Sequence, residues 1–145
     1  MKFPLLVLTC RCFEQPFALP AAQVARVLGA AQFVSIAGLA GCAVGVVNVA
    51  GVNLALCDSR IALGLASAGL NPADRFIELE ALELGTRRWL LWVEEVVDII
   101  TVTRDQCDAL HVADGALVRH ALRLPLGTVP LLDLAALEPG AVISD

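Results

Sequence analysis

The chain has 145 residues, of which 58% are hydrophobic and 17% are charged, and its formal net charge is −5. This apolar content can offset the entropy lost on ordering, so a folded chain is expected rather than a disordered one. The acidic balance and the scarcity of clustered Lys and Arg argue against a nucleic-acid partner, whose phosphates require a basic surface. The length suits one domain, or two very small subdomains around a shared core.

Short apolar segments make up the first half of the chain. Strands are predicted at residues 3–12, 17–19 and 25–28, a helical turn at 21–24, and a hairpin of 44–49 with 52–57. Asp58 should cap a short helix through Leu63, because its carboxylate can accept from the N–H groups of the first turn. Residues 67–74 are the expected linker between the two halves, since they contain Gly69 and Asn71-Pro72.

The second half follows the same plan. Strands are predicted at 76–84, 87–93, 97–102, 118–124 and 128–132, with a helical turn at 94–96 and a polar loop at 103–115. In the first of these strands Phe76, Glu78 and Glu80 alternate with Ile77, Leu79 and Ala81. Asp133 should cap a last short helix at 134–137, which Pro139-Gly140 ends. Many short strands at regular spacing predict an all-β pair of barrels.

Two segments of the chain occur in similar form twice. The segment 17–27 is similar to 89–99, and 54–63 is similar to 129–137, so the copies lie 72 and 75 residues apart. In the second pair an apolar strand ends in an Asp and continues into a short helix. A repeat of half the chain length predicts two similar units packed against each other.

Few residues in the chain suggest catalysis or metal binding. Cys107 and His111 are four residues apart, but no second pair completes a four-ligand metal site, and no cofactor is expected. Nothing near a cysteine marks it as an activated nucleophile, although Cys57 or Cys107 would be the residue of a thiol-dependent sensor or enzyme. Asp58 and Asp133 are best explained as helix caps, and Trp89, Trp92, Phe17 and Phe76 as core residues.

The 31 residues between Arg26 and Asp58 carry no charge. This stretch is long enough to cross a bilayer, but its glycines, asparagines and small apolar residues favour buried strands or an exposed partner-binding surface. An odd number of cysteines without a Cys-x-x-Cys pair is typical of free thiols in a reducing compartment. We therefore expect a cytoplasmic protein that does not insert into the membrane.

The segment 45–65 begins with Gly-Val-Val-Asn-Val-Ala-Gly, continues through Cys-Asp-Ser-Arg and ends with Leu-Gly-Leu. It resembles the signature of the CheW-like domain. That family typically reads G-V-x-N-L-R-G-x-x-x-P-x-x-D-L-R-x-x-L-G-L. The segment 17–27 is similar to the family's F-A-L-P-x-x-x-V-x-E-V, and 91–96 to its L-L-V-D-x-V. The segment 129–134 is similar to its closing V-P-L-L-D-L. The four motifs span nearly the whole chain in the family's order and spacing.

The resemblance implies two five-stranded SH3-like β-barrels around a shared hydrophobic core, with short helices. It also implies a subdomain 1 of about 14–71 and a subdomain 2 of 1–13 plus 72–138. Its implied role is non-catalytic, namely a chemotaxis adaptor that links the cytoplasmic tip of a chemoreceptor to the regulatory domain of a CheA-type histidine kinase. A chemosensory system for pilus-based or surface motility is one setting that we expect for it.

Three positions depart from the family pattern. The family Arg of N-L-R-G is Ala50, the family Glu of V-x-E-V is Arg26, and the family Pro after the hairpin is Ala55. The Arg and Glu of the family usually form an ion pair near the receptor-facing groove. Because an unpaired buried charge is costly, Arg26 is expected to face solvent or to find another partner.

The leading hypothesis is a CheW-like adaptor that binds through strand edges and the apolar hairpin 44–56. The residues expected to contact a partner are Val44, Val46, Val47, Asn48, Val49, Ala50, Gly51 and Arg26. Asp at Val47 or Val49 is expected to weaken binding while the fold survives. A scaffold that has lost kinase coupling and binds another protein or itself is the alternative, and a thiol-dependent sensor or enzyme is a third.

Overall fold

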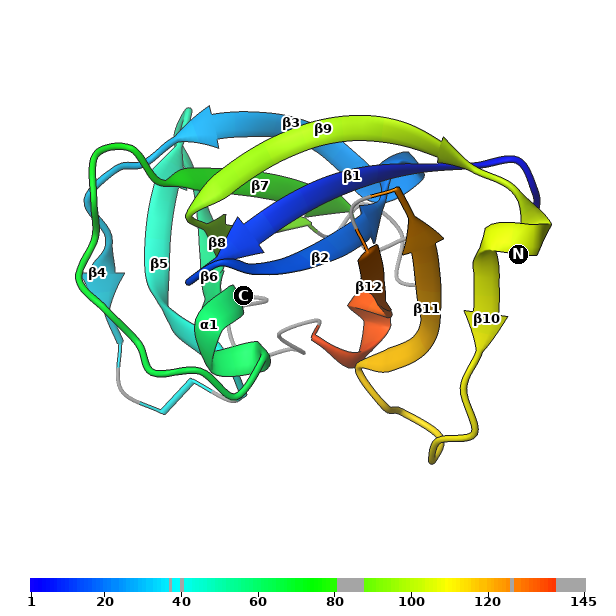
Figure 1. Ribbon diagram of the computed structural model, residues 1–145. Coiled ribbons are helices and arrows are strands. Elements are labelled where there is room, and N and C mark those ends of the chain that lie inside the picture. Colours follow the sequence, from blue (N-terminus) through cyan, green and yellow to red (C-terminus); the bar gives the residue numbers. More distant parts are fainter. Residues whose placement is uncertain (37, 40, 81–87, 126, 138–145) are drawn as a thin grey trace.

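The computed structural model describes residues 1–36, 38–39, 41–80, 88–125 and 127–137. Strands account for most of this part of the chain (Figure 1). They are β1 (Leu5–Cys12), β2 (Gln15–Pro20), β3 (Val24–Gly29), β4 (Val34–Ser35), β5 (Ala43–Val49), β6 (Val52–Asp58), β7 (Arg75–Glu80), β8 (Arg88–Val93), β9 (Glu95–Val102), β10 (Cys107–Ala109), β11 (Val118–Leu124) and β12 (Gly127–Leu132). The short helices are η1 (Ala21–Gln23), α1 (Ser59–Ala62), η3 (Arg104–Gln106) and η4 (Leu134–Ala136).

The strands form two six-stranded sheets. Sheet A has the order β10-β11-β12-β2-β1-β9, and sheet B has the order β3-β7-β8-β6-β5-β4. This all-β arrangement confirms the predicted fold class, and each sheet includes one very short edge strand, β10 or β4. Figure 1 shows sheet B on the left and the β10–β12 part of sheet A on the right, with β1, β3 and β9 along the same side of the molecule.

The two copies of the repeat are interleaved between the sheets. In sheet B, β6 runs parallel to β8, with Leu56 opposite Leu90. In sheet A, β12 runs parallel to β2, with Leu131 opposite Ala18. Each sheet therefore pairs a strand of the 17–27 or 89–99 segment with a strand of the 54–63 or 129–137 segment from the other copy of the repeat. The chain passes from sheet A to sheet B near residues 21–23 and back to sheet A near residue 94, and β2 stays paired with β1 in sheet A. The subdomain limits of about 14 and 71–72 stay a prediction.

One apolar cluster joins the sheets. Its buried members come from both, with Leu8, Phe17 and Leu132 in sheet A and Leu79 and Leu91 in sheet B. Sheets A and B each have a further cluster of their own. The predicted core aromatics Phe17, Phe76, Trp89 and Trp92 are all buried. This arrangement confirms that the two barrels share a core.

Both predicted Asp caps are present. Asp58 Oδ1 accepts from the Arg60 N–H at 3.0 Å, and Asp133 Oδ1 accepts from the Ala135 N–H at 3.2 Å. Two local predictions are wrong. Glu95 and Val96 belong to β9 rather than to a helical turn, because they continue the pairing with β1. The expected loop 103–115 contains η3 and β10, since Thr103 and Gln106 form a capping box. Residues 81–84 and 87 of the predicted strands and the stop at Pro139-Gly140 lie outside the described residues.

Candidate functional site

The tip of the β5–β6 hairpin is a tight two-residue turn. Val49 is paired with Val52, and the two residues between them, Ala50 and Gly51, have φ angles of 50° and 90°. Positive φ at both positions is the geometry of a type I′ turn, which matches the twist of the strands it joins. The Asn48 side-chain oxygen accepts from the Gly51 N–H at 3.0 Å. Asn48, Ala50, Gly51 and Val52 are exposed, so the tip projects a small and mostly uncharged surface.

The valines in the middle of this hairpin do not share that exposure. Val46 and Val47 are 8% and 5% exposed, and Val44 and Val49 are partly buried against the sheet B core. The side chains of Val46 and Val47 are therefore too buried for the partner contact that the sequence suggested. The burial of Val47 argues against the expectation that Asp at this position leaves the fold intact, because the substitution would put a carboxylate into the core. Of the predicted contact residues, the hairpin tip and Arg26 remain accessible.

Arg26 on β3 is ion-paired with a buried glutamate of the neighbouring strand β7. Its Nε donates to Glu78 Oε1 of β7 at 2.9 Å, and Arg88 Nη1 of β8 donates to Glu78 Oε2 at 3.2 Å. Glu78 is only 1% exposed, whereas the two arginine side chains are 50% and 49% exposed. A carboxylate buried to this degree needs paired cations, and the two guanidinium groups supply them from either side. The expectation that Arg26 faces solvent or is paired is met in both respects.

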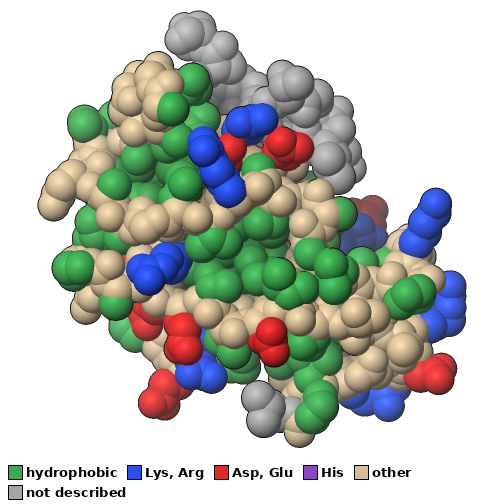
Figure 2. Space-filling view, turned by 90° about the horizontal axis from the view of Figure 1, so that it is seen from above, with side chains coloured by type: hydrophobic (Ala, Val, Ile, Leu, Met, Phe, Trp, Pro, Cys, Tyr) green, Lys and Arg blue, Asp and Glu red, His purple; other side chains and the backbone are tan. Residues whose placement is uncertain are grey.

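Two edge strands carry further exposed apolar side chains. On β3 Val27 is 43% exposed, and on β9 Val97 and Ile99 are 42% and 58% exposed. We call these three residues the β3/β9 apolar face. Figure 2, viewed from the side along which these strands run, shows hydrophobic side chains gathered in the middle, with Lys or Arg and Asp or Glu side chains at their border. Exposed apolar groups with a polar border are typical of protein-binding surfaces.

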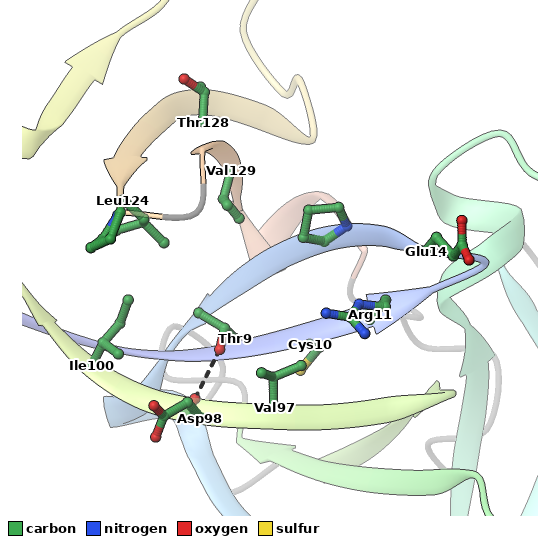
Figure 3. Close-up of a pocket in the computed structure, with 12 residues that line it drawn as sticks. Thr9, Cys10, Arg11, Glu14, Val97, Asp98, Ile100, Leu124, Thr128 and Val129 are labelled. Carbon is green, nitrogen blue, oxygen red and sulfur yellow. Dashed lines mark hydrogen bonds between the residues drawn. The ribbon is translucent and has the colours of Figure 1, made fainter.

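A groove that shares Val97 with the β3/β9 apolar face lies in sheet A, between β1 and β9 on one side and the β11–β12 hairpin on the other (Figure 3). Its volume is about 550 Å³. Thr9 Oγ1 donates to the Asp98 carbonyl oxygen at 3.2 Å and so fixes β1 against β9 at its base. The lining is mainly apolar, with charged groups at the rim, and consists of Thr9, Cys10, Arg11, Glu14, Pro16, Val97, Asp98, Ile100, Leu124, Pro125, Thr128 and Val129.

A buried ionic cluster holds the two sheets together. The Arg60 guanidinium donates from Nε to Asp58 Oδ1 at 3.0 Å, lies 3.5 Å from Glu94, and stacks over the Trp92 ring at 4.3 Å. Glu94 in turn accepts from the Phe13 N–H at 2.9 Å, in the β1–β2 turn of sheet A. Because every charge in this cluster has a partner, it fixes the position of one sheet relative to the other.

The five cysteines are all unpaired, and four of them are buried. A hydrogen bond with Cys42, together with burial, raises the pKa of the Cys57 thiol. Burial and the nearby Asp108 raise the pKa of Cys107. The two thiols that a cysteine-dependent enzyme or sensor would use are thus disfavoured as thiolates, the reactive form. Within the described ranges no three His, Cys, Asp or Glu side chains are placed to hold a metal ion, and no helix is long and apolar enough to cross a membrane.

A comparison with protein-family models matches the CheW-like domain over residues 6–139. The chain belongs to the CheW-like domain family. Members of this family act as scaffolds or adaptors in chemotaxis signalling. Among solved structures, the scaffolding protein TtCheW from Thermoanaerobacter tengcongensis has a similar fold, with a TM-score of 0.78 and 18% sequence identity over 91% of this chain and 90% of that one. No curated protein matches the chain in sequence.

Sequence reasoning missed three parts of the site in this CheW-like chain. The alternation of β7 placed Glu78 on one side of the strand, but both sides are buried, so its role as a buried anion was hidden. Val97 has no partner on β1 because the register of β9 shifts there, and this irregularity breaks the alternation that could have marked Ile99 as exposed. The groove depends on strands from both ends of the chain, and no local signal encodes it.

Proposed function

We propose that the protein is a non-catalytic adaptor, acting in the cytoplasm, that links a chemoreceptor to the regulatory domain of a CheA-type histidine kinase. The observation that carries this proposal is a CheW-like chain with two accessible surfaces on different elements. One is the β3/β9 apolar face, and the other is the tip of the β5–β6 hairpin. An adaptor requires two such surfaces, because it must hold two partners at the same time.

The β3/β9 apolar face suits the helical tip of a chemoreceptor. Val27, Val97 and Ile99 provide apolar contacts on two edge strands, and Arg26 adds a charged group from β3. The hairpin tip suits a barrel-to-barrel contact with the kinase regulatory domain, because a rigid type I′ turn can insert between strands of a partner without reordering. Both surfaces are small, so each contact should be of modest area and readily reversible.

Matched valine and isoleucine variants test this assignment. The probes are the purified signalling fragment of a chemoreceptor and the purified kinase regulatory domain, both encoded in the same genome. Ile99→Asp should weaken binding of the receptor fragment at least about fivefold, because it puts a charge into an apolar contact. Val34→Asp, at a valine that is 67% exposed on the short edge strand β4, should bind as the unchanged protein does.

Several results would contradict the proposal. One is that the unchanged protein binds neither probe in calorimetry at micromolar concentration. A stable homodimer without affinity for the kinase domain would instead favour a scaffold that has lost kinase coupling. A thiol that reacts rapidly at neutral pH would favour a thiol-dependent sensor. Adjacent genes for a receptor, a kinase or pilus assembly would identify the motility system that the adaptor serves.

A further inference from the structure

We propose that Arg26, held in place by Glu78, forms a carboxylate-recognition site, which selects a helical partner segment that carries an Asp or Glu beside its apolar stripe. This inference rests on the proposed function, because it describes the chemistry of the receptor segment that docks at the β3/β9 apolar face. It goes further in assigning a sign of charge and a contact atom to that partner.

The first support is the way in which Glu78 orients the two guanidinium groups. Arg26 bonds to Glu78 only through Nε, and among the described residues nothing bonds to its two terminal nitrogens. Arg88 uses Nη1 for Glu78, and its Nη2 lies 3.5 Å from the half-exposed Glu80. Two carboxylates thus engage Arg88, whereas Arg26 is held at one nitrogen and keeps a planar edge of N–H donors that fits a carboxylate with two parallel hydrogen bonds.

The second support is the charge of the surroundings. The whole chain carries a net charge of −5, so an acidic partner segment is repelled by most of its surface. Within the described part of the molecule, Arg88 is paired with both Glu78 and Glu80, whereas Arg26 is paired with the buried Glu78 alone and keeps free donors at a half-exposed position. An acidic side chain that reaches Arg26 therefore gains charged hydrogen bonds there, which sets the orientation of the partner as well as its affinity.

The third support decides between a helix and a strand as the occupant. The free edge of β3 could in principle accept an added strand, but its pairing with β7 has a bulge between Val24 and Arg26. A bulge twists the edge and breaks the regular spacing of N–H and C=O groups that an added strand would need. A helix makes its contacts through side chains and has no such requirement, so the irregular edge suits it better.

The test measures binding of the purified chemoreceptor signalling fragment by calorimetry at two salt concentrations. Arg26→Gln should weaken binding about 10- to 100-fold, the range for losing a charged hydrogen bond, and Arg26→Lys should show an intermediate loss because it keeps the charge but not the planar edge. Arg88→Gln, which removes a cation already engaged by Glu78 and Glu80, should weaken binding less than Arg26→Gln. The control is Arg123→Gln on β11, which removes a similarly exposed, ion-paired arginine from sheet A and should leave the affinity within about twofold.

A double-mutant cycle identifies the partner carboxylate. Each acidic residue beside the apolar stripe of the fragment is changed to its amide, and one change should weaken binding to the unchanged protein but not to Arg26→Gln. Thermal unfolding checks that each variant is folded, and Arg26→Lys keeps a cation on Glu78 if Arg26→Gln is unstable. Affinity within twofold of the unchanged protein for Arg26→Gln or Arg26→Lys, or an equal loss in Arg123→Gln, would overturn the inference alone. Failure of the unchanged protein to bind either the receptor fragment or the kinase domain would overturn the proposed function with it.

Discussion

Two valines of one hairpin provide a direct test of which part of it is core and which is surface. Val47 is buried in the sheet B core, whereas Val52 at the tip is 57% exposed. In Val47→Asp, the lost burial of the valine side chain costs about 1.5–3 kcal/mol. A carboxylate without a cation in an apolar cluster adds several kcal/mol more. The sum, about 4 kcal/mol or more, is a large part of the roughly 5–15 kcal/mol that stabilises a folded domain.

Urea and thermal unfolding measure this difference. Val47→Asp should lower the melting temperature by about 10 °C or more, while Val52→Asp should change the free energy of unfolding by no more than about 0.5 kcal/mol. In binding experiments Val52→Asp should weaken capture of the kinase regulatory domain although it is fully folded. The reasoning is refuted if Val47→Asp is as stable as the unchanged protein, since the hairpin would then present Val47 to solvent.

Three further predictions concern the backbone and the thiols. Ala50→Asn should stabilise the protein by about 1 kcal/mol and raise its melting temperature by about 2–4 °C, because Asn tolerates the left-handed conformation that Ala resists; an unchanged or lower melting temperature would contradict a type I′ turn. Gly45→Ala should destabilise the protein by about 1–3 kcal/mol in urea unfolding, because its added methyl group would collide with the backbone of β4; a neutral effect would mean that β4 does not pack there. Burial raises the pKa of the Cys10 and Cys12 thiols, so both stay protonated in the folded protein at a pH where they ionise in the unfolded chain, and the folded state loses stability as the pH rises through about 9.0. The free energy of unfolding should therefore fall between pH 7 and 10, and less so in Cys10→Ala; a flat profile would show that these thiols ionise as easily in the folded protein.

Much of the fold could be predicted because its signals are local. Apolar runs bounded by turn residues predicted the strands of both sheets except the short edge strands β4 and β10, and Asp58 and Asp133 predicted the starts of two helices. The repeat predicted two similar units, although not how they are combined. The pairing of β6 with β8 and of β12 with β2 joins segments from different copies, and similarity between copies says nothing about which copy a strand will choose.

The candidate site was harder to predict, because exposure depends on what packs on both faces of a strand. The apolar run at 44–49 fits an exposed docking strand and a strand buried on both faces equally well, and the structure places Val46 and Val47 in the interior. Glu78 is a second case. Its cations come from β3 and β8, of which β3 lies 52 residues away in sequence, so no local pattern marks Glu78 as buried and paired.

The double pairing of Glu78 bears on how this surface can change over generations. Either Arg26 or Arg88 alone provides a cation for the buried carboxylate, so a mutation at one of them does not leave an unpaired charge inside the barrel. Position 26 can therefore take on new side chains, one step at a time, while the fold tolerates each intermediate. A chain with a single ion pair would have to change both residues together. Because of this redundancy, the residue at position 26 can change by a single mutation when the contact residue of the partner changes.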